Sequence, residues 1–547
     1  MGKIKELKYY DVQKVGTIKE LLEIAVEQAG DKIAFKYKDE KGKVIDVTYK
    51  EFQKDTFELG TALNSINMAD KHIAVIGENS YKWVTVYLTV LKSKGVIVPI
   101  DKELPVCDII NVLNDSDSEV LFYAKKYEKN IDEIAEKAPN VKYFIGFSTE
   151  KTEGNRLSYN EFKAEGKKLY EGGDKTYAEM ITDHNNLKML VYTSGTTGMA
   201  KGVMLSEHNL ISIVYYGLRV STVYDRCLSV LPYHHTYEAV AGILVSLHHH
   251  STICINDSLK AVLKNLQLYK PDYIYVVPAF VELFYKKIWS NAKESHKDKI
   301  LKVMMIVSNG LRKIGIDLRK KFFKSIHDAF GGNLRKIVTG GAAVRPELGK
   351  FFDTIGIDLI NGYGITECSP LVSVNMDYCN DCSTVGFPLE CVEIKLEDVT
   401  PEGDGEICVK GDIVMLGYYK NPEKTAEVLQ DGWFRTGDYG RIKNLIVLDN
   451  GKNVFPEEIE NYIMRIPYVQ EVVVSGVKDE CGSEVRLCAE VFLNEDKLKE
   501  LDIKDAEQTL KKDIAKECSI LPMYKRIGKV VIRDKEFAKT TTNKIKR

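Results

Sequence analysis

Long apolar runs are missing from this 547-residue chain: no stretch of eighteen consecutive apolar residues occurs, and the first residues are charged. A helix that crosses a bilayer needs about 20 mostly apolar residues, and a secretory leader needs an apolar core after its basic start. The sequence therefore predicts neither a membrane-spanning helix nor a signal peptide. We expect a cytoplasmic protein.

The chain also lacks a marked excess of charge and a dense cysteine framework. Its 77 Lys and Arg residues nearly balance 79 Asp and Glu residues, and eleven cysteines are scattered along it. A balanced charge gives no general attraction to nucleic acid. Scattered cysteines are typical of reduced thiols. The pair Cys379 and Cys382 has zinc-like spacing, but no fourth ligand stands at a suitable distance in sequence, so no metal is expected there.

Length and hydrophobic pattern predict two domains, because 547 residues exceed what one core normally holds. Continuous apolar strands at 72–77 and 96–100, separated by a helical stretch, are typical of a parallel sheet covered on both faces. After residue 438 the pattern changes to a short α+β series. We predict an α/β protein with a large N-terminal domain of parallel-sheet α/β subdomains, residues 1–438, and a small C-terminal α+β domain, residues 439–547.

A loop of glycines and hydroxyls follows the apolar strand at 189–192 and closes at Lys201. Glycines let backbone N–H groups approach an anion, hydroxyls add hydrogen-bond donors, and the lysine adds a positive charge. The spacing excludes a Walker A loop, because Lys201 follows Ala200 rather than a glycine. The loop therefore predicts a polyphosphate site, with a plain surface linker as the alternative.

A second stretch runs from Asn361 to Glu367, directly after the apolar strand at 358–360. Its glycines flank Tyr363, so a base ring could stack close to the backbone. Thr366 and Glu367 then offer a hydroxyl and a carboxylate for a phosphate and its magnesium. A strand-to-turn corner is the alternative. The small residues at 340–343 leave room either for a ligand or for close helix packing.

These two stretches resemble the signatures of the adenylate-forming enzymes, the AMP-binding superfamily of acyl-CoA synthetases, luciferases and peptide-synthetase adenylation domains. The similarity covers nearly the whole chain and is strongest toward bacterial long-chain fatty acyl-CoA synthetases. It implies a ligase that activates a long-chain fatty acid with ATP as an acyl-adenylate, releases pyrophosphate, and transfers the acyl group to coenzyme A. ATP, Mg²⁺ and coenzyme A are the implied cofactors and co-substrates. The C-terminal domain is implied to be a mobile lid.

The resemblance also implies roles for single residues. It assigns catalysis to Lys544, which bridges the acid carboxylate and the α-phosphate, together with Thr366, Glu367 and His235, the last at the tunnel entrance. Magnesium ligation falls to Glu367 and Thr196. The residues matched to nucleotide or coenzyme A binding are Thr193, Ser194, Gly195, Thr196, Thr197, Gly198, Lys201, Gly341, Ala342, Asn361, Gly362, Tyr363, Gly364, Asp438, Arg441, Lys443 and Lys452.

Residue reasoning adds detail at three of these places. His234 and His235 are adjacent, so on an extended chain they point to opposite sides, which makes a joint metal site unexpected. Asp438 stands in what reads as a tight glycine turn, where a carboxylate can accept both ribose hydroxyls. Asn543 replaces the glycine that the family has before the terminal lysine, and asparagine tolerates a left-handed backbone better than most residues.

The link after Asp438 is shorter than in the family, where a hairpin of about a dozen residues usually separates the ribose-binding acid from the lid hinge. Here Asp438-Tyr439-Gly440 runs directly into Arg441. By type and order, Arg441 matches a contact to ribose and phosphate, and Lys443 lies near the position about which the lid turns. Because a short link has few dihedral angles to absorb rotation, we predict a slow second half-reaction.

Some alternatives stay open at this level. The basic amphipathic stretch 297–324 suits a solvated helical face, which we favour, or a peripheral contact with an anionic membrane. The acid could be another carboxylate, and the acceptor could be a carrier-protein thiol. A non-catalytic nucleotide-binding relative is the alternative outside enzymes. Acyl chain length, acceptor and oligomeric state do not follow from the residues.

Overall fold

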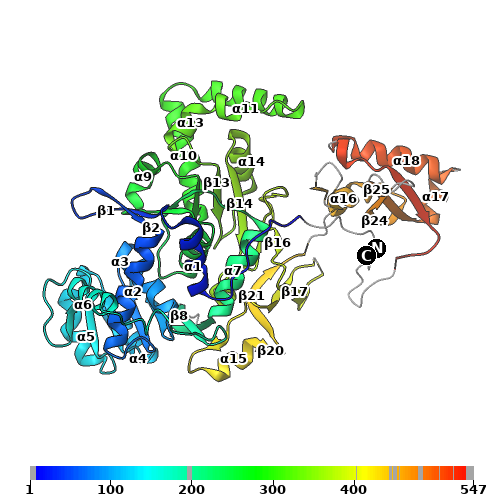
Figure 1. The fold of residues 1–547 in the computed structure, drawn as a ribbon. Helices are drawn as coiled ribbons and strands as arrows, with labels where there is room; N and C mark the ends of the chain where they lie inside the picture. Colours follow the sequence, from blue (N-terminus) through cyan, green and yellow to red (C-terminus); the bar gives the residue numbers. More distant parts are fainter. Residues whose placement is uncertain are drawn as a thin grey trace. The chain divides into compact units, whose positions relative to one another are not determined.

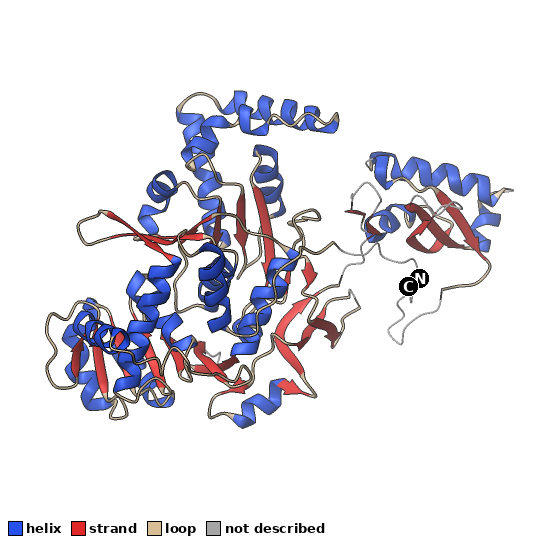
Figure 2. Ribbon diagram, viewed as in Figure 1, coloured by secondary structure: helices blue, strands red, loops and turns tan. Residues whose placement is uncertain are grey.

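The computed structural model describes residues 8–193, 200–401, 403–442, 446–447, 453–454, 456–478, 485–503, 505–521 and 523–537. Helices and mainly parallel sheets alternate along the chain, which confirms the predicted α/β class (Figures 1 and 2). The chain divides into two compact units. The larger holds Tyr10–Lys395 and Cys408–Thr436, and the smaller holds Met1–Tyr9, Leu396–Ile407 and Gly437–Arg547. The boundary that we predicted after residue 438 stays a prediction.

Two large sheets form the larger unit. One is eight-stranded, in the order β19-β9-β8-β4-β3-β5-β6-β7. Its strands are β3 (His72–Ile76), β4 (Val96–Ile100), β5 (Val120–Tyr123), β6 (Tyr143–Gly146), β7 (Arg156–Ser158), β8 (Leu187–Thr193), β9 (Lys201–Ser206) and β19 (Gly417–Tyr418). The apolar runs predicted as β3 and β4 pair in parallel, and all but His72 are fully buried. Burial on both faces explains why these runs show no alternation of polar residues.

The other large sheet is nine-stranded, in the order β16-β15-β14-β13-β12-β10-β11-β1-β2. Its strands are β1 (Ile33–Lys38), β2 (Val44–Thr48), β10 (Arg226–Ser229), β11 (Thr252–Ile255), β12 (Tyr273–Val276), β13 (Lys336–Thr339), β14 (Asp358–Tyr363), β15 (Ser373–Val374) and β16 (Phe387–Pro388). Its core packs Ile274 and Ile337 from the sheet against Leu266, Phe284 and Phe352 from covering helices. β12, β13 and β14 are parallel neighbours, so their carboxyl ends meet at one edge.

Helices cover these sheets. They are α1 (Ile18–Ala29), α2 (Tyr49–Ser65), α3 (Tyr81–Leu91), α4 (Val106–Asp115), α5 (Ile131–Lys137), α6 (Tyr159–Glu171), α7 (Glu207–Val220), the π-helix η2 (Tyr237–Leu244), α8 (Val245–His248), α9 (Val262–Tyr269), α10 (Pro278–Glu294), α11 (Asp298–Lys313), α12 (Arg319–Phe322), α13 (Lys324–Ala329), α14 (Pro346–Ile355) and α15 (Pro422–Val428). No described helix combines the length and apolar composition that a membrane-spanning segment needs.

The first two helices begin where the sequence places their caps. Thr48-x-x-Glu51 is the sequence pattern of a capping box, and the two residues form one, because each side chain accepts a hydrogen bond from the other residue's backbone N–H. At α1 the cap is only half of that motif. The Thr17 hydroxyl accepts from Glu20 N, but the Glu20 carboxylate accepts from Gly16 N at 2.6 Å. Local side-chain hydrogen bonds therefore cap both helices. The two glutamates differ in their partner: Glu51 accepts from the N-cap residue Thr48, and Glu20 accepts from Gly16, one residue before the N-cap.

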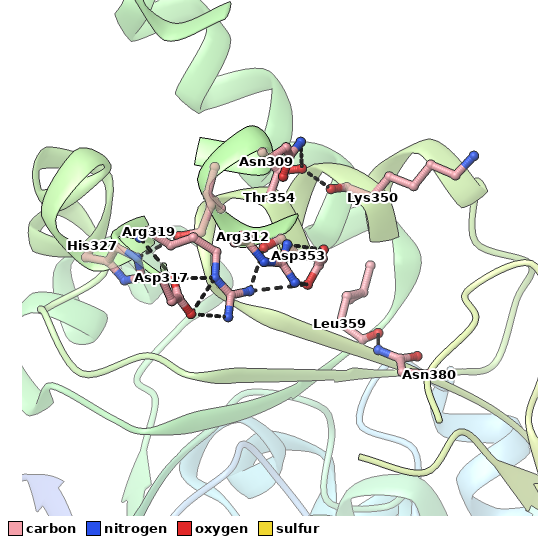
Figure 3. Close-up of polar contacts among 11 residues, drawn as sticks. Asn309, Arg312, Asp317, Arg319, His327, Lys350, Asp353, Thr354, Leu359 and Asn380 are labelled. Carbon is pink, nitrogen blue, oxygen red and sulfur yellow. Dashed lines mark hydrogen bonds and ion pairs between the residues drawn. The ribbon is translucent and has the colours of Figure 1, made fainter. Parts of the chain in front are cut away.

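The helical stretch 281–329, which includes the basic amphipathic residues 297–324, is divided among α10, α11, α12 and α13. Two left-handed positions break it, His296 with φ 54° and Gly315 with φ 83°. Figure 1 shows α11 extending beyond α10 and α13 at the top of the view. An ion-pair network fixes its carboxyl end: Arg312 pairs with Asp353 of α14 at 2.7 Å, and Arg319 reaches the same carboxylate (Figure 3).

The smaller unit and its neighbouring strands complete the chain. A four-stranded sheet has the order β17-β18-β21-β20, with β17 (Val392–Glu397), β18 (Gly405–Gly411), β20 (Leu429–Gln430) and β21 (Trp433–Gly440). The α+β elements that follow are β22 (Ile446–Val447), β23 (Asn453–Val454), α16 (Pro456–Ile463), β24 (Val469–Lys478), β25 (Val485–Leu493), α17 (Glu495–Glu500), α18 (Ala506–Glu517) and β26 (Lys529–Arg533). The apolar faces of α16 and α18 pack on the β24-β25-β26 sheet.

Candidate active site

An apolar cavity of about 100 Å³ lies at the carboxyl edge of β12, β13 and β14. Its wall contains Gly340 and Gly341, which follow β13, and the segment from Gly362 to Thr366 at the end of β14. Side chains of α7 and η2 close the opposite side. The carboxyl ends of parallel strands are where open α/β sheets hold their ligands. Both stretches that the sequence singled out after β13 and β14 therefore reach one cavity.

Two glycines of this wall differ in the space around them. A Cβ on Gly364 would lie 1.7 Å from the carbonyl oxygen of Pro370, so only glycine allows that close approach. Gly341 has φ 79°, and no atom lies within 4 Å of the place where its Cβ would stand. Free space beside the backbone is the feature that the small residues at 340–343 predicted. Ala342 itself is exposed, and Asn361 is buried with its amide donating to Thr384 O at 3.0 Å.

Glu367 and Lys201 come together through a residue that the sequence reasoning missed, Tyr418. The Tyr418 hydroxyl donates to Glu367 Oε1 at 3.0 Å, and Lys201 Nζ lies 5.6 Å from the centre of the Tyr418 ring. Burial and the neighbouring Glu367 carboxylate raise the pKa of Tyr418, which keeps its proton on the phenol. The available signal was an aromatic pair directly after Gly417. Tyr418 thus contacts the Glu367 carboxylate and lies near the Lys201 ammonium. Glu367 directly follows Thr366, which is on the cavity wall.

The strands on each side of the predicted phosphate loop, β8 and β9, pair with each other. β8 and β9 are antiparallel, and Thr193 at the end of β8 pairs with Lys201 at the start of β9. The loop residues predicted to bind phosphate lie outside the described residues: Ser194, Gly195, Thr196, Thr197 and Gly198. Lys443, Lys452 and Lys544 also lie outside them. Their predicted roles stay predictions.

The two adjacent histidines lie in a turn and not on an extended segment, because the chain reverses after Pro232 before η2 begins. His234 Nε2 lies 3.4 Å from Asp101 Oδ1, whereas His235 belongs to the cavity wall. His235 Nδ1 accepts from Tyr237 N at 3.2 Å, and burial lowers the pKa of His235. A neutral imidazole with Nδ1 so occupied carries its proton on Nε2. That N–H can donate to a carboxylate in the cavity.

A buried carboxylic acid follows these histidines. Glu238 lies in the π-helix η2, and its Oε1 accepts from the Ser229 hydroxyl at 2.6 Å. Burial raises the pKa of Glu238 to about 8. π-Helical turns are rare and often occur at functional sites. Sequence reasoning missed this acid, because its burial depends on the contact between β10 and η2 in the folded chain.

Asp438 lies in the strand β21, not in the tight turn that we expected. The aromatic residues Trp433 and Phe434 favour a strand, and the adjacent Gly437, with φ 74°, bends it locally. Asp438 is exposed, and Arg441 forms two 3.0 Å hydrogen bonds to Asp404. These residues belong to the smaller unit, whereas the residues that line the cavity belong to the larger one. Within the described ranges, no group of three His, Cys, Asp or Glu side chains could hold a metal.

Comparison with known proteins identifies the class. Residues 22–419 match the AMP-binding enzyme family, and residues 458–544 match the AMP-binding enzyme C-terminal domain. Since the first match alone covers more than half of the chain, the chain belongs to the AMP-binding enzyme family, and it is an adenylate-forming acyl ligase. This confirms the resemblance that the two signature stretches carried. Enzymes of this family use ATP.

Several curated relatives are similar over most of the chain. A chloroplastic long-chain-fatty-acid–[acyl-carrier-protein] ligase of Arabidopsis thaliana is 27% identical over 96% of this chain and 83% of its own length. Long-chain-fatty-acid–CoA ligase 5 of Rattus norvegicus is 29% identical over 79% and 69%, respectively. Both acceptors, coenzyme A and carrier protein, thus occur among the names of the relatives.

Solved structures share the fold. A fatty acyl CoA synthetase of Mycobacterium tuberculosis superposes with a TM-score of 0.60 at 21% identity, covering 97% of this chain and 96% of that one. An anthranilate CoA ligase in complex with anthranoyl-AMP gives a TM-score of 0.62 at 20% identity, covering 98% and 96%. These likenesses confirm the predicted architecture of a large α/β N-terminal domain with a small C-terminal domain.

Proposed function

We propose that this chain is a fatty acid–CoA ligase, which activates the acid as an acyl-adenylate and then transfers the acyl group to coenzyme A. The observation that carries the proposal is the cavity wall, which joins an apolar segment on α7 and η2 to the glycine-lined segment at Tyr363 and Thr366. An apolar pocket with a few convergent polar groups suits an acyl chain that ends in a carboxylate. The names of the CoA-ligase relatives support both the acid and the acceptor.

The residues present fit a bound nucleotide. The open space at Gly341 leaves room beside the backbone, and the Tyr363 ring stands at the same edge. ATP supplies the activated phosphorus and the pyrophosphate leaving group when it is bound. We assign stacking to Tyr363, α-phosphate contact to Thr366, and a magnesium ion to Glu367 with Thr196. Positive charge from Lys201, and from Lys544 in the terminal motif, would offset charge that develops at the phosphates.

His235 would orient the acid. Its ring borders the cavity and its Nδ1 accepts from Tyr237 N, so Nε2–H would donate to one carboxylate oxygen while the other oxygen attacks phosphorus. Asp438 would accept the ribose hydroxyls, and Arg441 would contact ribose and phosphate. Lys452 belongs to the lid segment that approaches coenzyme A in the resemblance, and Lys443 lies near the position about which the lid turns. The 438/439 boundary then separates the adenylating domain from the lid.

The test is ATP–pyrophosphate exchange by the purified full-length chain across a panel of straight-chain, branched and aryl acids, followed by thioester formation. We expect exchange that depends on a straight-chain acid, and transfer to coenzyme A in preference to a phosphopantetheinylated carrier protein. Transfer to carrier protein alone would replace the acceptor in the proposal. Tight ATP binding without exchange for any acid would favour the non-catalytic alternative.

A peripheral membrane contact is a second proposal, and the outward face of α11 is the observation that favours it over a plain solvated face. Ile300, Val303 and Ile306 are 56%, 58% and 73% exposed. At a helical period they share one side of α11, with Lys299 and Lys302 beside them. Apolar side chains flanked by lysines suit the surface of an anionic lipid bilayer.

A further inference from the structure

A buried ion pair at the amino end of β13, Lys336 with Asp377, contacts Ser221 on the cavity wall, and we take it as the floor of the acyl end. We propose that this floor limits the acyl group to about eight to ten carbons, so that this chain prefers medium-length acids to the long-chain acids that its relatives' names suggest. The inference rests on the proposed activation of a fatty acid and narrows it to a substrate class. Four observations carry it: two independent lengths, the floor and the walls.

The first length comes from α7. Ile213, Gly217 and Ser221 all belong to the cavity wall, and they are spaced four residues apart. Residues at this spacing lie above one another on one side of a helix. At a rise of about 1.5 Å per residue, the eight steps from Ile213 to Ser221, the residue that caps α7, span about 12 Å. The part of the wall that α7 contributes therefore extends over slightly more than two turns, from Ile213 to the cap at Ser221.

The second length comes from β13. Gly340 stands at the glycine-lined edge, Val338 belongs to the wall, and Lys336 lies two residues further on the same face of the strand. At about 3.3 Å per residue, the four steps from Lys336 to Gly340 span about 13 Å. Two elements that approach the cavity from different sides thus give the same depth.

Both elements end at the same polar group. Lys336 Nζ lies 2.6 Å from Asp377 Oδ1 and also donates to Ser221 Oγ at 3.2 Å and to Thr222 O at 2.5 Å. The Lys336 side chain is 0% exposed, and Asp377 accepts a further hydrogen bond from the Tyr10 hydroxyl. The ammonium has all three donors in use. Pushing a methyl end through this group would separate buried charges, which is costly.

The walls above the floor are apolar, which selects an alkyl chain. Val223, Val245, Tyr275 and Val338 line them. Carbon–carbon bonds of about 1.5 Å give an extended chain about 1.3 Å per carbon. The depth of about 12 to 13 Å, given by the lengths along α7 and β13, then accommodates about nine or ten carbons. An acid of sixteen carbons would extend well past the floor.

The experiment measures ATP–pyrophosphate exchange by the full-length chain with saturated acids of four to sixteen carbons, at one fixed detergent concentration. We expect kcat/KM to peak at eight to ten carbons and to fall at least about tenfold at sixteen, since single methylenes are worth about that factor in a closed pocket. A maximum at six or fewer carbons, or at fourteen or more, overturns the inference. Absence of exchange with every acid would instead overturn the proposed function.

A variant at Gly217 tests whether the depth of the cavity along α7 sets the preferred acyl length. Gly217 lies half-way along the wall, and a Cβ there would meet only Leu371 Cδ2, at 3.7 Å. Leucine is a better helix former than glycine, so Gly217→Leu should fold while it fills the deep half of the cavity. We expect the preferred length to shorten to about four to six carbons, and kcat/KM for decanoate to fall at least about tenfold.

The matched control is Gly310→Leu, the same change in α11 at a position where a Cβ would have no atom within 4 Å. It should keep the parent profile. An unchanged profile in Gly217→Leu, with thermal unfolding that shows a folded protein, overturns the assigned depth. Gly217→Ala provides a second variant with a smaller side chain, for which we expect a shift in the same direction by fewer carbons.

Discussion

At the scale of single residues, Glu238 couples the stability of the protein to pH. Its pKa is raised from 4.5 to about 8 in the folded chain by burial. The unfolded chain loses this proton near 4.5, while the folded chain keeps it until about pH 8. Between these values the folded state binds more protons, so the free energy of unfolding decreases as pH rises.

Glu238→Gln should remove this dependence, because glutamine cannot ionise and can still accept from Ser229. We expect the stability of the variant relative to the parent to increase between pH 5 and pH 8, by about 3 to 4 kcal/mol. Thermal unfolding at both pH values measures the change. Glu347→Gln, at an exposed position on α14, is the control and should show the same difference at both. A constant difference for Glu238→Gln would contradict the burial argument.

Glu367 tests the assigned magnesium site. Glu367→Gln removes the negative charge at nearly constant volume and leaves an oxygen for the Tyr418 hydroxyl. We expect ATP–pyrophosphate exchange to fall by about tenfold or more and to need a higher magnesium concentration. Tyr418→Phe, which keeps the carboxylate, should leave the magnesium titration close to that of the parent. If the titration of Glu367→Gln matches the parent, Glu367 is not a metal ligand.

At the scale of elements, α11 has an exposed apolar side and a carboxyl end held by ion pairs. Arg312 and Arg319 both reach Asp353, so the helix is tied to α14 (Figure 3). Ile306 is 73% exposed on the outward side. A membrane contact would bury this side chain, and a charge there would oppose it.

We expect Ile306→Asp to reduce co-sedimentation of the full-length chain with phosphatidylserine vesicles at least about threefold, while exchange activity without vesicles stays near the parent level. Ile181→Asp is the matched control, because Ile181 is 83% exposed outside α11. Equal loss in both variants would mean that any exposed charge weakens binding. No binding by the parent would leave α11 a solvated helix.

Some elements could be predicted from the sequence because their cause is local. β3 and β4 follow from continuous apolar runs, and the cap of α2 from Thr48 and Glu51. The left-handed backbone at His296, which ends a helix inside 281–329, had no such signal, because only a few per cent of non-glycine residues adopt it.

Some residues of the candidate site could likewise be predicted from the sequence, and others could not. The strand ends that carry Gly341 and Tyr363 could be placed in order along the chain. Tyr418 could not be joined to Glu367, because 51 residues separate them and only the pairing of β19 with β9 brings Tyr418 to that place. The floor at Lys336 likewise needs Asp377 and Ser221 from distant segments.

At the scale of the whole molecule, the short link after Asp438 should separate the two half-reactions. Strand β21 continues to Gly440, and Arg441 is hydrogen bonded to Asp404 directly after it. A link with few free dihedral angles should slow any rearrangement between adenylation and thioester formation. We therefore expect bound acyl-adenylate to accumulate before coenzyme A is acylated.

Rapid-quench measurement of acyl-adenylate in the presence of coenzyme A tests this expectation. A variant with a family-like hairpin of about a dozen residues inserted after Gly440 should show less accumulation, because its link has more dihedral angles. The prediction fails if the intermediate never builds up and the insertion leaves the second step unchanged.

Above the floor at Lys336, the open depth of the proposed acyl cavity depends on Gly217, which has consequences for how specificity can evolve. Every glycine codon becomes an alanine or a valine codon by a single base change. Each of these side chains would occupy the space beside Leu371 without opening the floor at Lys336. A population carrying this gene could therefore shorten its preferred acid in one mutational step. Return to the longer acid would require only the reverse base change.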